Sequence, residues 1–365
     1  MRLLIATPLY PPEPGGPATY AQVLEETLPK EGIEVTLAKF RDVRGLPKII
    51  RHIAYFFMLC SKGKHADALL ALDPVSTGLP AALAARVLNK PFFVKVVGDY
   101  AWEQGTQRFG VQGTLDEFTS ERQLPFMVRM LLDIERWVAL RAKKIIVPSN
   151  YLKSVVMRWR IHSEKIVVIH NAVSITDIGT VPDAVAALPH PVIVSVGRLV
   201  PWKGMKGLID AVEKIRETVP VSLVIVGSGP EQEALTRLAH KKLGGAGFVL
   251  GELPHADALA VMQAADVFAL NTAYEGLSHL LIEALALGLP IITTPVGGNT
   301  ELITHGENGM LVRSGDCVAL SQAITAVLAD EPLRARLSEA AKTSAERFSL
   351  GTLGKETAAL IKENI

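Results

Sequence analysis

The feature that most constrains the fold of this chain is a repeated alternation of short apolar runs with longer helical stretches. In the first half the runs lie at 2–7, 34–38, 68–72, 91–97, 144–148 and 165–170. In the second half the runs, with the loops that follow them, lie at 191–196, 221–230, 248–254, 267–271 and 290–294. Apolar strands separated by helices are typical of parallel sheets covered by helices on both faces. The alternation therefore predicts an α/β chain in which both halves are doubly wound.

The length of the chain allows two domains. Its 365 residues are enough for two domains of ordinary size, each with a core of its own. The segment 171–191 contains prolines and shows little periodicity, so we place the boundary there. The expected domains are 1–173 and 190–348.

Charge and composition exclude some classes of partner. The net charge is +1, which gives no global electrostatic support for a nucleic-acid partner. Cys60 and Cys317 are far apart and match no metal or redox spacing, as suits a reducing compartment. No apolar run approaches the roughly 18 residues of a spanning helix, and prolines interrupt the apolar N-terminus at once. We expect a cytoplasmic protein.

The segment 48–62 combines basic residues with aromatic and aliphatic ones. One interpretation is a surface helix that rests on anionic lipid, which would place the protein peripherally at the inner face of a membrane. The other interpretation is an ordinary helix packed on the sheet. The sequence leaves both open.

Two glutamates mark the loop and helix between Tyr274 and Pro290. The run 267–270 predicts a strand, and Ser278 is placed to cap the helix that follows. Glu275 lies in the loop, whereas Glu283 lies one to two turns into the helix. The helix N-terminus favours an anion between them. Two carboxylates flanking an anion site suit a nucleotide sugar, although each glutamate alone could be a solvated charge.

Two cations follow the strand 191–196. Arg198 and Lys203 are five residues apart in one loop and can neutralise a diphosphate, the first as a fork and the second as a point charge. If the diphosphate is a leaving group, the same pair stabilises its growing charge. The chain contains no Asp-x-Asp pattern, so no carboxylate-held metal is expected and the cations would replace it.

Further candidates are weak individually but share a position after a predicted strand. In the alternative interpretation the glycines only form turns, and the aspartate caps a helix. Their common location at the carboxyl ends of parallel strands makes them candidates for ligand contacts. These residues are Gly16, Asp99, Gly197, Gly227, Glu252 and Leu253.

Several of these motifs together resemble a known family. GRLVPWKG, YEGLSHLLIEALALGLPIITT and PVGGNTELITHGENGMLV are similar to the signature of the family 4 retaining glycosyltransferases, also called glycosyl transferases group 1. PSNYL and KIVVIHNAV match in order as well, so the resemblance covers nearly the whole chain. It implies the GT-B architecture, in which two Rossmann-like domains face each other across a cleft. It also implies a last helix, about 349–365, that packs back on the N-terminal, acceptor-binding domain.

The resemblance also implies an activity. Members of this family move a sugar, with retention of configuration, from a nucleoside diphosphate sugar to a hydroxyl acceptor. The acceptor would be a glycan, a glycolipid or another lipid-linked sugar. Arg198 and Lys203 would bind the donor diphosphate, and Glu283 would hydrogen-bond the ribose.

Further residues take roles from the same resemblance. Glu275 would face the donor sugar, and Gly16 would approach the diphosphate from the first domain. Asp99 stands where many members have a histidine, so it would take that residue's place as a catalytic residue together with Arg198, Lys203 and Glu275. Ala172 stands where many members have a glycine. The amides that would contact phosphate or sugar belong to Gly276, Leu277 and Ser278.

Other functions remain open at this level. A sugar-nucleotide epimerase or hydrolase could use the same fold, and formation of a new glycoside would separate it from a transferase. A non-catalytic nucleotide-sugar-binding protein is a further alternative. A nicotinamide-dependent dehydrogenase fits less well, because the first strand is not followed by the glycine fingerprint. The nucleotide, the sugar and the acceptor are not identified by the sequence.

Overall fold

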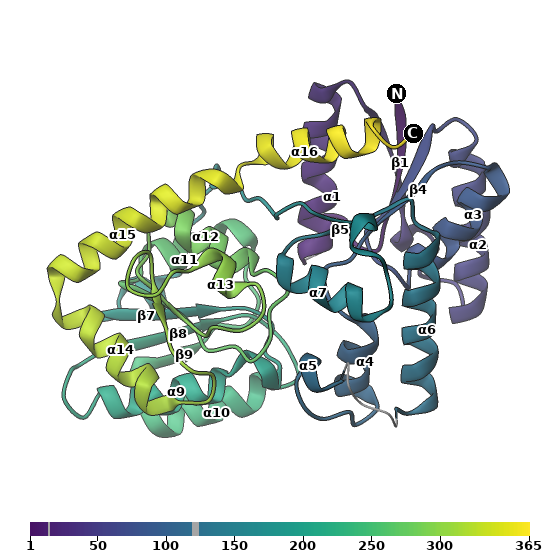
Figure 1. The fold of residues 1–365 in the computed structure, drawn as a ribbon. Helices are drawn as coiled ribbons and strands as arrows, with labels where there is room; N and C mark the ends of the chain where they lie inside the picture. Colours follow the sequence, from purple (N-terminus) through teal and green to yellow (C-terminus); the bar gives the residue numbers. More distant parts are fainter. Residues whose placement is uncertain (14, 119–123) are drawn as a thin grey trace. The chain divides into compact units, whose positions relative to one another are not determined.

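The structure is a computed structural model that describes residues 1–13, 15–118 and 124–365. The chain forms two compact units (Figure 1). The first contains Met1–Ala172 and Leu350–Ile365, and the second contains Val173–Ser349. The second unit is thus inserted into the first, and its ends meet, since Val173 N donates to Phe348 O at 3.3 Å. The binding roles expected for the two domains stay predictions.

The first unit contains one six-stranded sheet in which all pairs are parallel. The strand order is β2-β1-β3-β4-β5-β6. The strands are β1 (Arg2–Thr7), β2 (Glu34–Lys39), β3 (Ala68–Ala71), β4 (Phe92–Lys95), β5 (Lys144–Val147) and β6 (Ile166–Val168). Each lies on an apolar run of the sequence.

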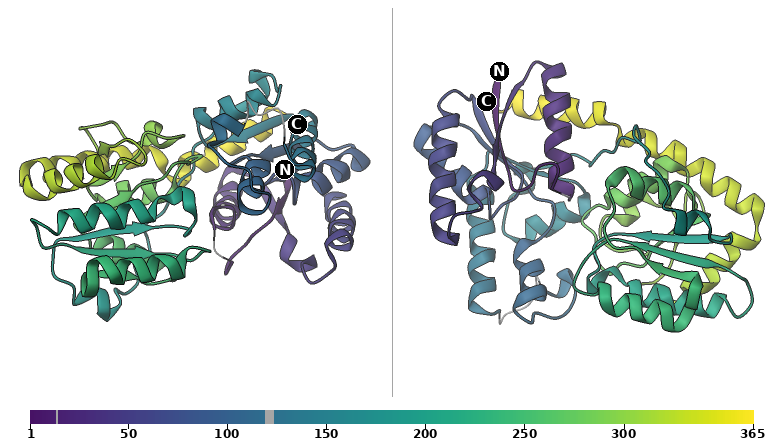
Figure 2. Two further views of the ribbon diagram at one scale, coloured as in Figure 1. Left: turned by 90° about the horizontal axis from the view of Figure 1, so that it is seen from below. Right: turned by 180° about the vertical axis from the view of Figure 1, so that it is seen from behind.

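Helices cover both faces of this sheet. The helix α1 (Gly16–Thr27) packs with α16 (Leu350–Lys362) on one face, against Leu3 and Ile5 of β1. Figure 2 shows α16 beside α1 from two further sides. Leu4 points the other way, because a Cβ on Gly63 of α2 would lie 3.6 Å from it. The other helices are α2 (Lys48–Gly63), α3 (Gly78–Leu88), α4 (Tyr100–Arg108), α5 (Leu115–Phe118), α6 (Phe126–Arg141) and α7 (Asn150–Arg158).

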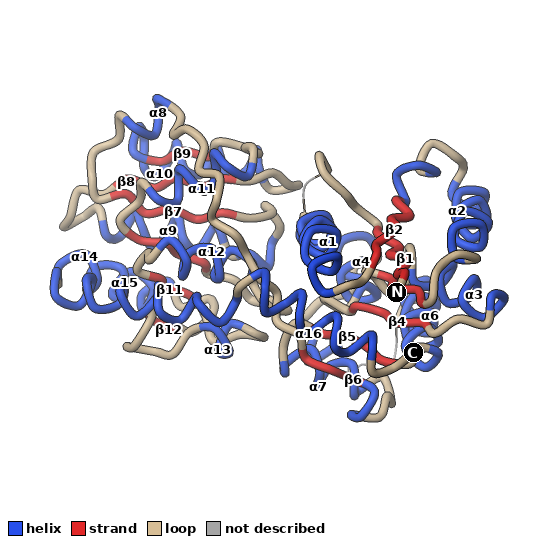
Figure 3. Tube along the Cα trace, turned by 90° about the horizontal axis from the view of Figure 1, so that it is seen from above, coloured by secondary structure: helices blue, strands red, loops and turns tan. Residues whose placement is uncertain are grey.

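The second unit also contains a six-stranded parallel sheet, in the order β12-β11-β10-β7-β8-β9 (Figure 3). The strands β8 and β9 lie on one side of β7, and β10, β11 and β12 lie on the other, which is the Rossmann order. The strands are β7 (Val192–Val196), β8 (Ser222–Val226), β9 (Gly247–Val249), β10 (Val267–Leu270), β11 (Ile291–Thr293) and β12 (Met310–Leu311). The strand β12 was not predicted, because its two residues are too few to show a pattern in the sequence.

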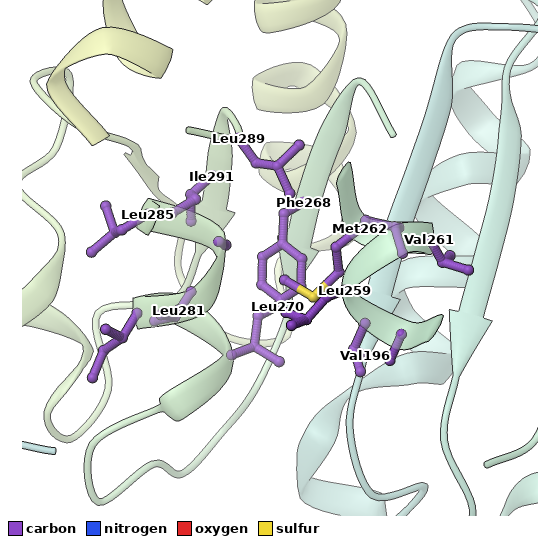
Figure 4. Packing of buried hydrophobic residues seen from close by; sticks show 14 of the residues in the cluster. Val196, Leu259, Val261, Met262, Phe268, Leu270, Leu281, Leu285, Leu289 and Ile291 are labelled. Carbon is purple, nitrogen blue, oxygen red and sulfur yellow. The ribbon is translucent and has the colours of Figure 1, made fainter. Parts of the chain in front are cut away.

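Helices again lie on both faces, and alternate residues of one strand serve the two cores. Phe268 and Leu270 of β10 pack with Leu281 and Leu285 of α12 (Figure 4), whereas Val267 and Ala269 belong to the opposite cluster. Full burial of such side chains contributes about 1.5–3 kcal/mol each. The helices are α8 (Asp183–Ala186), α9 (Met205–Ile215), α10 (Gln232–Leu243), α11 (His255–Gln263), α12 (His279–Leu287), α13 (Asn299–Leu302), α14 (Cys317–Ala329) and α15 (Glu331–Ala345). The predicted doubly wound α/β class is confirmed for both units.

Candidate active site

The carboxyl edge of the second sheet carries most of the predicted site residues. Arg198 and Lys203 follow β7, whereas Glu275 follows β10. These two strands are neighbours, and the strand order reverses between them. Such a switch point leaves a crevice outside the strand ends, where open α/β sheets bind ligands.

Lys203 and Glu275 meet at this point although 72 residues separate them. The Lys203 ammonium donates a hydrogen bond to Oε1 of Glu275, and the two side chains form an ion pair that is only 11% exposed on each side. A buried charge is tolerated when it is paired. The structure therefore joins the predicted diphosphate cation to the predicted sugar-facing carboxylate.

The loops that carry this pair are fixed to each other by backbone contacts. Lys203 ends a one-turn 3₁₀ helix and is followed by Gly204, whose φ is 65°. A Cβ on Gly204 would lie 1.9 Å from Asn271 O, so only glycine fits there. Ala273 N donates to Trp202 O at 2.6 Å, and Thr272 Oγ1 donates to the same oxygen at 3.2 Å. The position of the lysine is thus set by the neighbouring strand's loop.

Glycines allow three more loop backbones to approach each other. Gly227 has a φ of 143°, and a Cβ there would lie 1.9 Å from Gly197 O. Its N–H donates to Gly251 O at 2.7 Å. Gly197 and Gly227 therefore have a packing role at the strand ends, and their predicted contact with a donor stays a prediction.

The loop from Glu275 to Ser278 leads into α12. Ser278 Oγ accepts a hydrogen bond from Leu281 N at 3.3 Å, which is the N-cap that the sequence predicts. Gly298 N donates to Glu275 O at 3.1 Å and ties this loop to the one after β11. Gly276 and Leu277 lie between these fixed points. The helix N-terminus and its dipole are therefore held at the crevice.

Glu283 has a partner that the sequence analysis missed. Its Oε1 lies 2.8 Å from Nε2 of His255, the first residue of α11. The Glu283 side chain is 9% exposed, whereas that of His255 is 61% exposed. The hydrogen bond to Glu283 raises the pKa of His255, and partial burial acts against this rise. A lone histidine at a helix start gave no motif, so only the fold could reveal the contact.

The remaining candidates of this unit lie on the same edge. Glu252 accepts a hydrogen bond from Ser228 Oγ at 2.8 Å. Leu253 is partly buried against the core beside α11 and α12. Arg198 is exposed, with its guanidinium carbon 5.8 Å from the centre of the Trp202 ring. Arg198 and Lys203 both lie between β7 and α9.

Asp99 and Gly16 belong to the first unit. Gly16 begins α1. Asp99 is fully buried and caps α4, where its oxygens accept hydrogen bonds from Trp102 N at 2.8 Å and Trp159 Nε1 at 3.2 Å. Burial raises the pKa of Asp99 to about 6. The capping interpretation of Asp99 is confirmed, while its catalytic role stays a prediction.

The basic and aromatic segment 48–62 forms the helix α2, which both packs and exposes apolar side chains. Tyr55 and Leu59 are buried, whereas Ile50, Ile53 and Phe57 expose 53%, 52% and 63% of their surface. Among the described residues, no helix combines the length and hydropathy required to cross a bilayer. The same residues contain no group of three or more His, Cys, Asp or Glu side chains suited to a metal ion.

Two units, each with a six-stranded parallel sheet covered by helices, are the two parts of the GT-B class of fold. The family model for glycosyl transferases group 1 matches residues 183–344, and the model for glycosyltransferase family 4 matches residues 14–177. The chain belongs to the family 4 GT-B glycosyltransferases.

Curated relatives match mainly over part of their length. The lipopolysaccharide core biosynthesis glycosyltransferase LpsE of Rhizobium meliloti is 36% identical over 149 residues, which are 41% of this chain and 43% of that protein. The GDP-mannose-dependent alpha-(1-6)-phosphatidylinositol monomannoside mannosyltransferase of Mycolicibacterium smegmatis is 38% identical over 161 residues, 40% of each chain. Both alignments therefore span less than half of the relative.

Solved structures match over the whole chain. HepE of Anabaena, in complex with UDP-glucose, shares 21% identity with a TM-score of 0.76, and the match covers 100% of both chains. Sucrose-phosphate synthase from Thermosynechococcus elongatus shares 20% identity with a TM-score of 0.78, over 99% and 98% of the two chains. These matches show a common fold.

Proposed function

We propose that this protein is a retaining glycosyltransferase that moves a sugar from a nucleoside diphosphate sugar to a hydroxyl acceptor. The observation that carries this proposal is the buried Lys203–Glu275 pair at the switch point of the second sheet. A cation and a carboxylate fixed side by side suit a ligand that presents a diphosphate next to sugar hydroxyls. The names of the relatives and the UDP-glucose complex of HepE support the same class of reaction.

In the proposed reaction, the bond between the anomeric carbon and the diphosphate oxygen breaks. Negative charge builds on that oxygen, and Lys203 and Arg198 stabilise it. The acceptor oxygen forms the new bond on the same face, and its proton passes to the leaving phosphate. Glu275 would hold the Lys203 ammonium in place and accept a hydrogen bond from the donor sugar.

We also propose that transfer needs no metal ion. The two side-chain cations supply the positive charge that a divalent ion supplies in other transferases. Gly16, Gly197, Gly227, Glu252 and Leu253 remain proposed donor contacts.

The proposed ribose contact is Glu283, whose orientation is set by His255. Gly276, Leu277 and Ser278 would offer backbone amides at the helix start. Asp99 remains a proposed catalytic residue of the first unit.

The proposed acceptor is a glycan, a glycolipid or another lipid-linked sugar. Two relatives are named for lipopolysaccharide core biosynthesis and for a phosphatidylinositol mannoside. The exposed Ile50, Ile53 and Phe57 on α2 would rest on a cytoplasmic membrane surface. This peripheral contact would bring the enzyme to such an acceptor.

The first experiment is a binding and hydrolysis screen of the purified protein with UDP-, GDP- and ADP-sugars, with and without EDTA. We expect one nucleotide sugar to bind and to be hydrolysed slowly in EDTA. Addition of acceptors then tests for a new glycoside, whose anomeric configuration is read by NMR. An epimer as the sole product, or failure of every nucleotide sugar to bind, would contradict the proposal.

A matched pair of variants tests the cation. Lys203→Ala should lower turnover by about 10²–10³-fold, the range found when one transition-state donor is removed. Lys206→Ala removes an exposed lysine three residues away and should leave turnover unchanged. Equal turnover in both variants would contradict the proposed role of Lys203 in stabilising the leaving diphosphate.

A further inference from the structure

A pocket lies at the amino edge of the first unit's sheet. The helix α3 ends at Leu88 before β4, and α6 ends at Arg141 before β5. Both connections return the chain to the amino edge of the parallel sheet, opposite the edge where such sheets bind ligands. Between these helix ends is a pocket of about 670 Å³. The proposed transfer reaction does not use this edge.

The charged side chains that line this pocket are all positive. Of its ten lining residues, five are cationic and, within the described parts of the chain, none is acidic. The whole chain carries a net charge of only +1, so these cations are concentrated rather than typical of the surface. We call this group the amino-edge cluster; its members are Arg86, Lys90, Arg141, Lys143 and Lys165.

Two members of the amino-edge cluster have structural roles. Lys165 Nζ donates to Leu140 O at 2.8 Å and to Ala142 O at 3.2 Å, so it satisfies carbonyls at the end of α6. Arg141 lies over the Trp137 ring at 3.5 Å and donates to Trp137 O at 3.2 Å. A cation at a helix C-terminus is favourable on its own. These two residues therefore need no ligand to explain them.

The other three members have no such side-chain contacts. Arg86, Lys90 and Lys143 make no hydrogen bond through their side chains and no ion pair with any residue that the structure describes. Arg86 is in the last turn of α3, but Lys90 and Lys143 lie outside the helices. Like charges around one pocket repel each other. A bound anion would relieve this repulsion and use the unpaired donors.

We propose that this pocket binds a phosphate-bearing anion with more than one charge. A guanidinium fork and neighbouring ammonium groups match several phosphate oxygens. Val87 and Leu140 lie next to the cluster in sequence and expose 68% and 53% of their surface. The phosphate group can therefore belong to a soluble compound or to a lipid headgroup whose acyl chains meet these apolar side chains.

The test compares three proteins. The pocket variant carries Arg86→Gln, Lys90→Gln and Lys143→Gln. The control variant carries Arg108→Gln, Lys30→Gln and Lys153→Gln, which removes the same charge from residues outside the pocket lining. Both are compared with the wild type by calorimetric titration with inorganic tripolyphosphate. Sedimentation with vesicles of phosphatidylglycerol and phosphatidylcholine, and of phosphatidylcholine alone, forms the second arm. Circular dichroism confirms the fold of each variant.

The expected result is that the pocket variant binds at least about tenfold more weakly than the control variant, in at least one arm. Loss in the tripolyphosphate arm supports a soluble ligand, and loss restricted to the anionic vesicles supports a headgroup. A charge-preserving variant, Arg86→Lys with Lys90→Arg and Lys143→Arg, should retain binding. Binding that is absent from the wild type in both arms, or undiminished in the pocket variant, would overturn the proposal. Lys203→Ala removes only binding at the donor site, so the two proposals fail separately.

Discussion

The imidazole of His255 lies 2.8 Å from the carboxylate of Glu283, and this contact joins the start of α11 to the second turn of α12. It gives the proposed ribose-binding glutamate a titratable neighbour. The hydrogen bond raises the pKa of His255, so the folded protein holds this proton more tightly than the unfolded chain does. The orientation of Glu283 is therefore linked to pH.

This link predicts how His255→Ala changes stability with pH. Because the folded pKa lies above the unfolded value of about 6.5, the contribution is full below that value. It is lost as the pH rises through the folded pKa. Near pH 6, thermal denaturation should give the variant a free energy of unfolding that is lower than that of the wild type by less than about 1 kcal/mol. The difference is small because the imidazole is largely exposed. Near pH 9 the two should coincide, and a constant difference would contradict the link.

The Lys203–Glu275 pair predicts strong coupling in a double-mutant cycle. Lys203→Met leaves a buried carboxylate without its cation and should lower the free energy of unfolding by about 3 kcal/mol. Adding Glu275→Gln removes that charge, so the double variant should be more stable than Lys203→Met alone. Chemical denaturation of the four proteins measures the coupling. Additive effects would show that the pair does not act as a unit.

The close backbone contact at Gly227 predicts that only glycine is tolerated at this position. A Cβ there would meet Gly197 O, and the backbone is in a region that favours glycine. Gly227→Ala should lower the free energy of unfolding by more than about 1 kcal/mol. Gly245→Ala is a matched control, because nothing lies within 4 Å of a Cβ at that position. Denaturation curves should show the control within about 0.5 kcal/mol of the wild type.

The raised pKa of Asp99 predicts that the protein loses stability as the pH rises. In the folded protein it keeps its proton up to about pH 6, whereas an unfolded aspartate loses it near pH 3.9. The folded state binds more protons between these values, so the free energy of unfolding falls as the pH rises through them. Asp99→Asn keeps an oxygen that can cap the helix and should lose this dependence on pH. The free energy of unfolding of the variant should therefore rise relative to that of the wild type from about pH 4 to pH 7.

Two measurements accompany that prediction. Asp177→Asn, at an exposed carboxylate, should follow the wild-type profile. Turnover of a folded Asp99→Asn protein tests the catalytic proposal at the same time. A large loss of turnover would assign the carboxylate a role that the cap does not explain.

Patterns within a few residues explain what the sequence could predict. The apolar runs located the strands, and Ser278 marked the start of α12, because both signals are local. Position after a strand also predicted that Lys203 and Glu275 share one edge. Their direct contact, however, depends on which strands are neighbours, and β10 begins at Val267 whereas β7 ends at Val196.

Contacts that depend on burial and strand order were not predictable. His255 and Glu283 belong to different helices, and neither residue shows where the other lies. Glu135 is fully buried in α6 and accepts hydrogen bonds from Tyr100 N and Ala101 N, although an amphipathic pattern would place a glutamate outside. Burial of this kind is decided by the packing of α4 on α6.

The hydrogen bond between Val173 and Phe348 has a consequence for how such proteins diversify. The second unit begins and ends at adjacent points of the structure, as an inserted domain does. Two crossovers in the gene, at these two points, replace a whole sheet and all its loops while the first unit's core keeps every residue. Lineages can therefore acquire a new second sheet by recombination in one event, without passing through a series of partly altered intermediates.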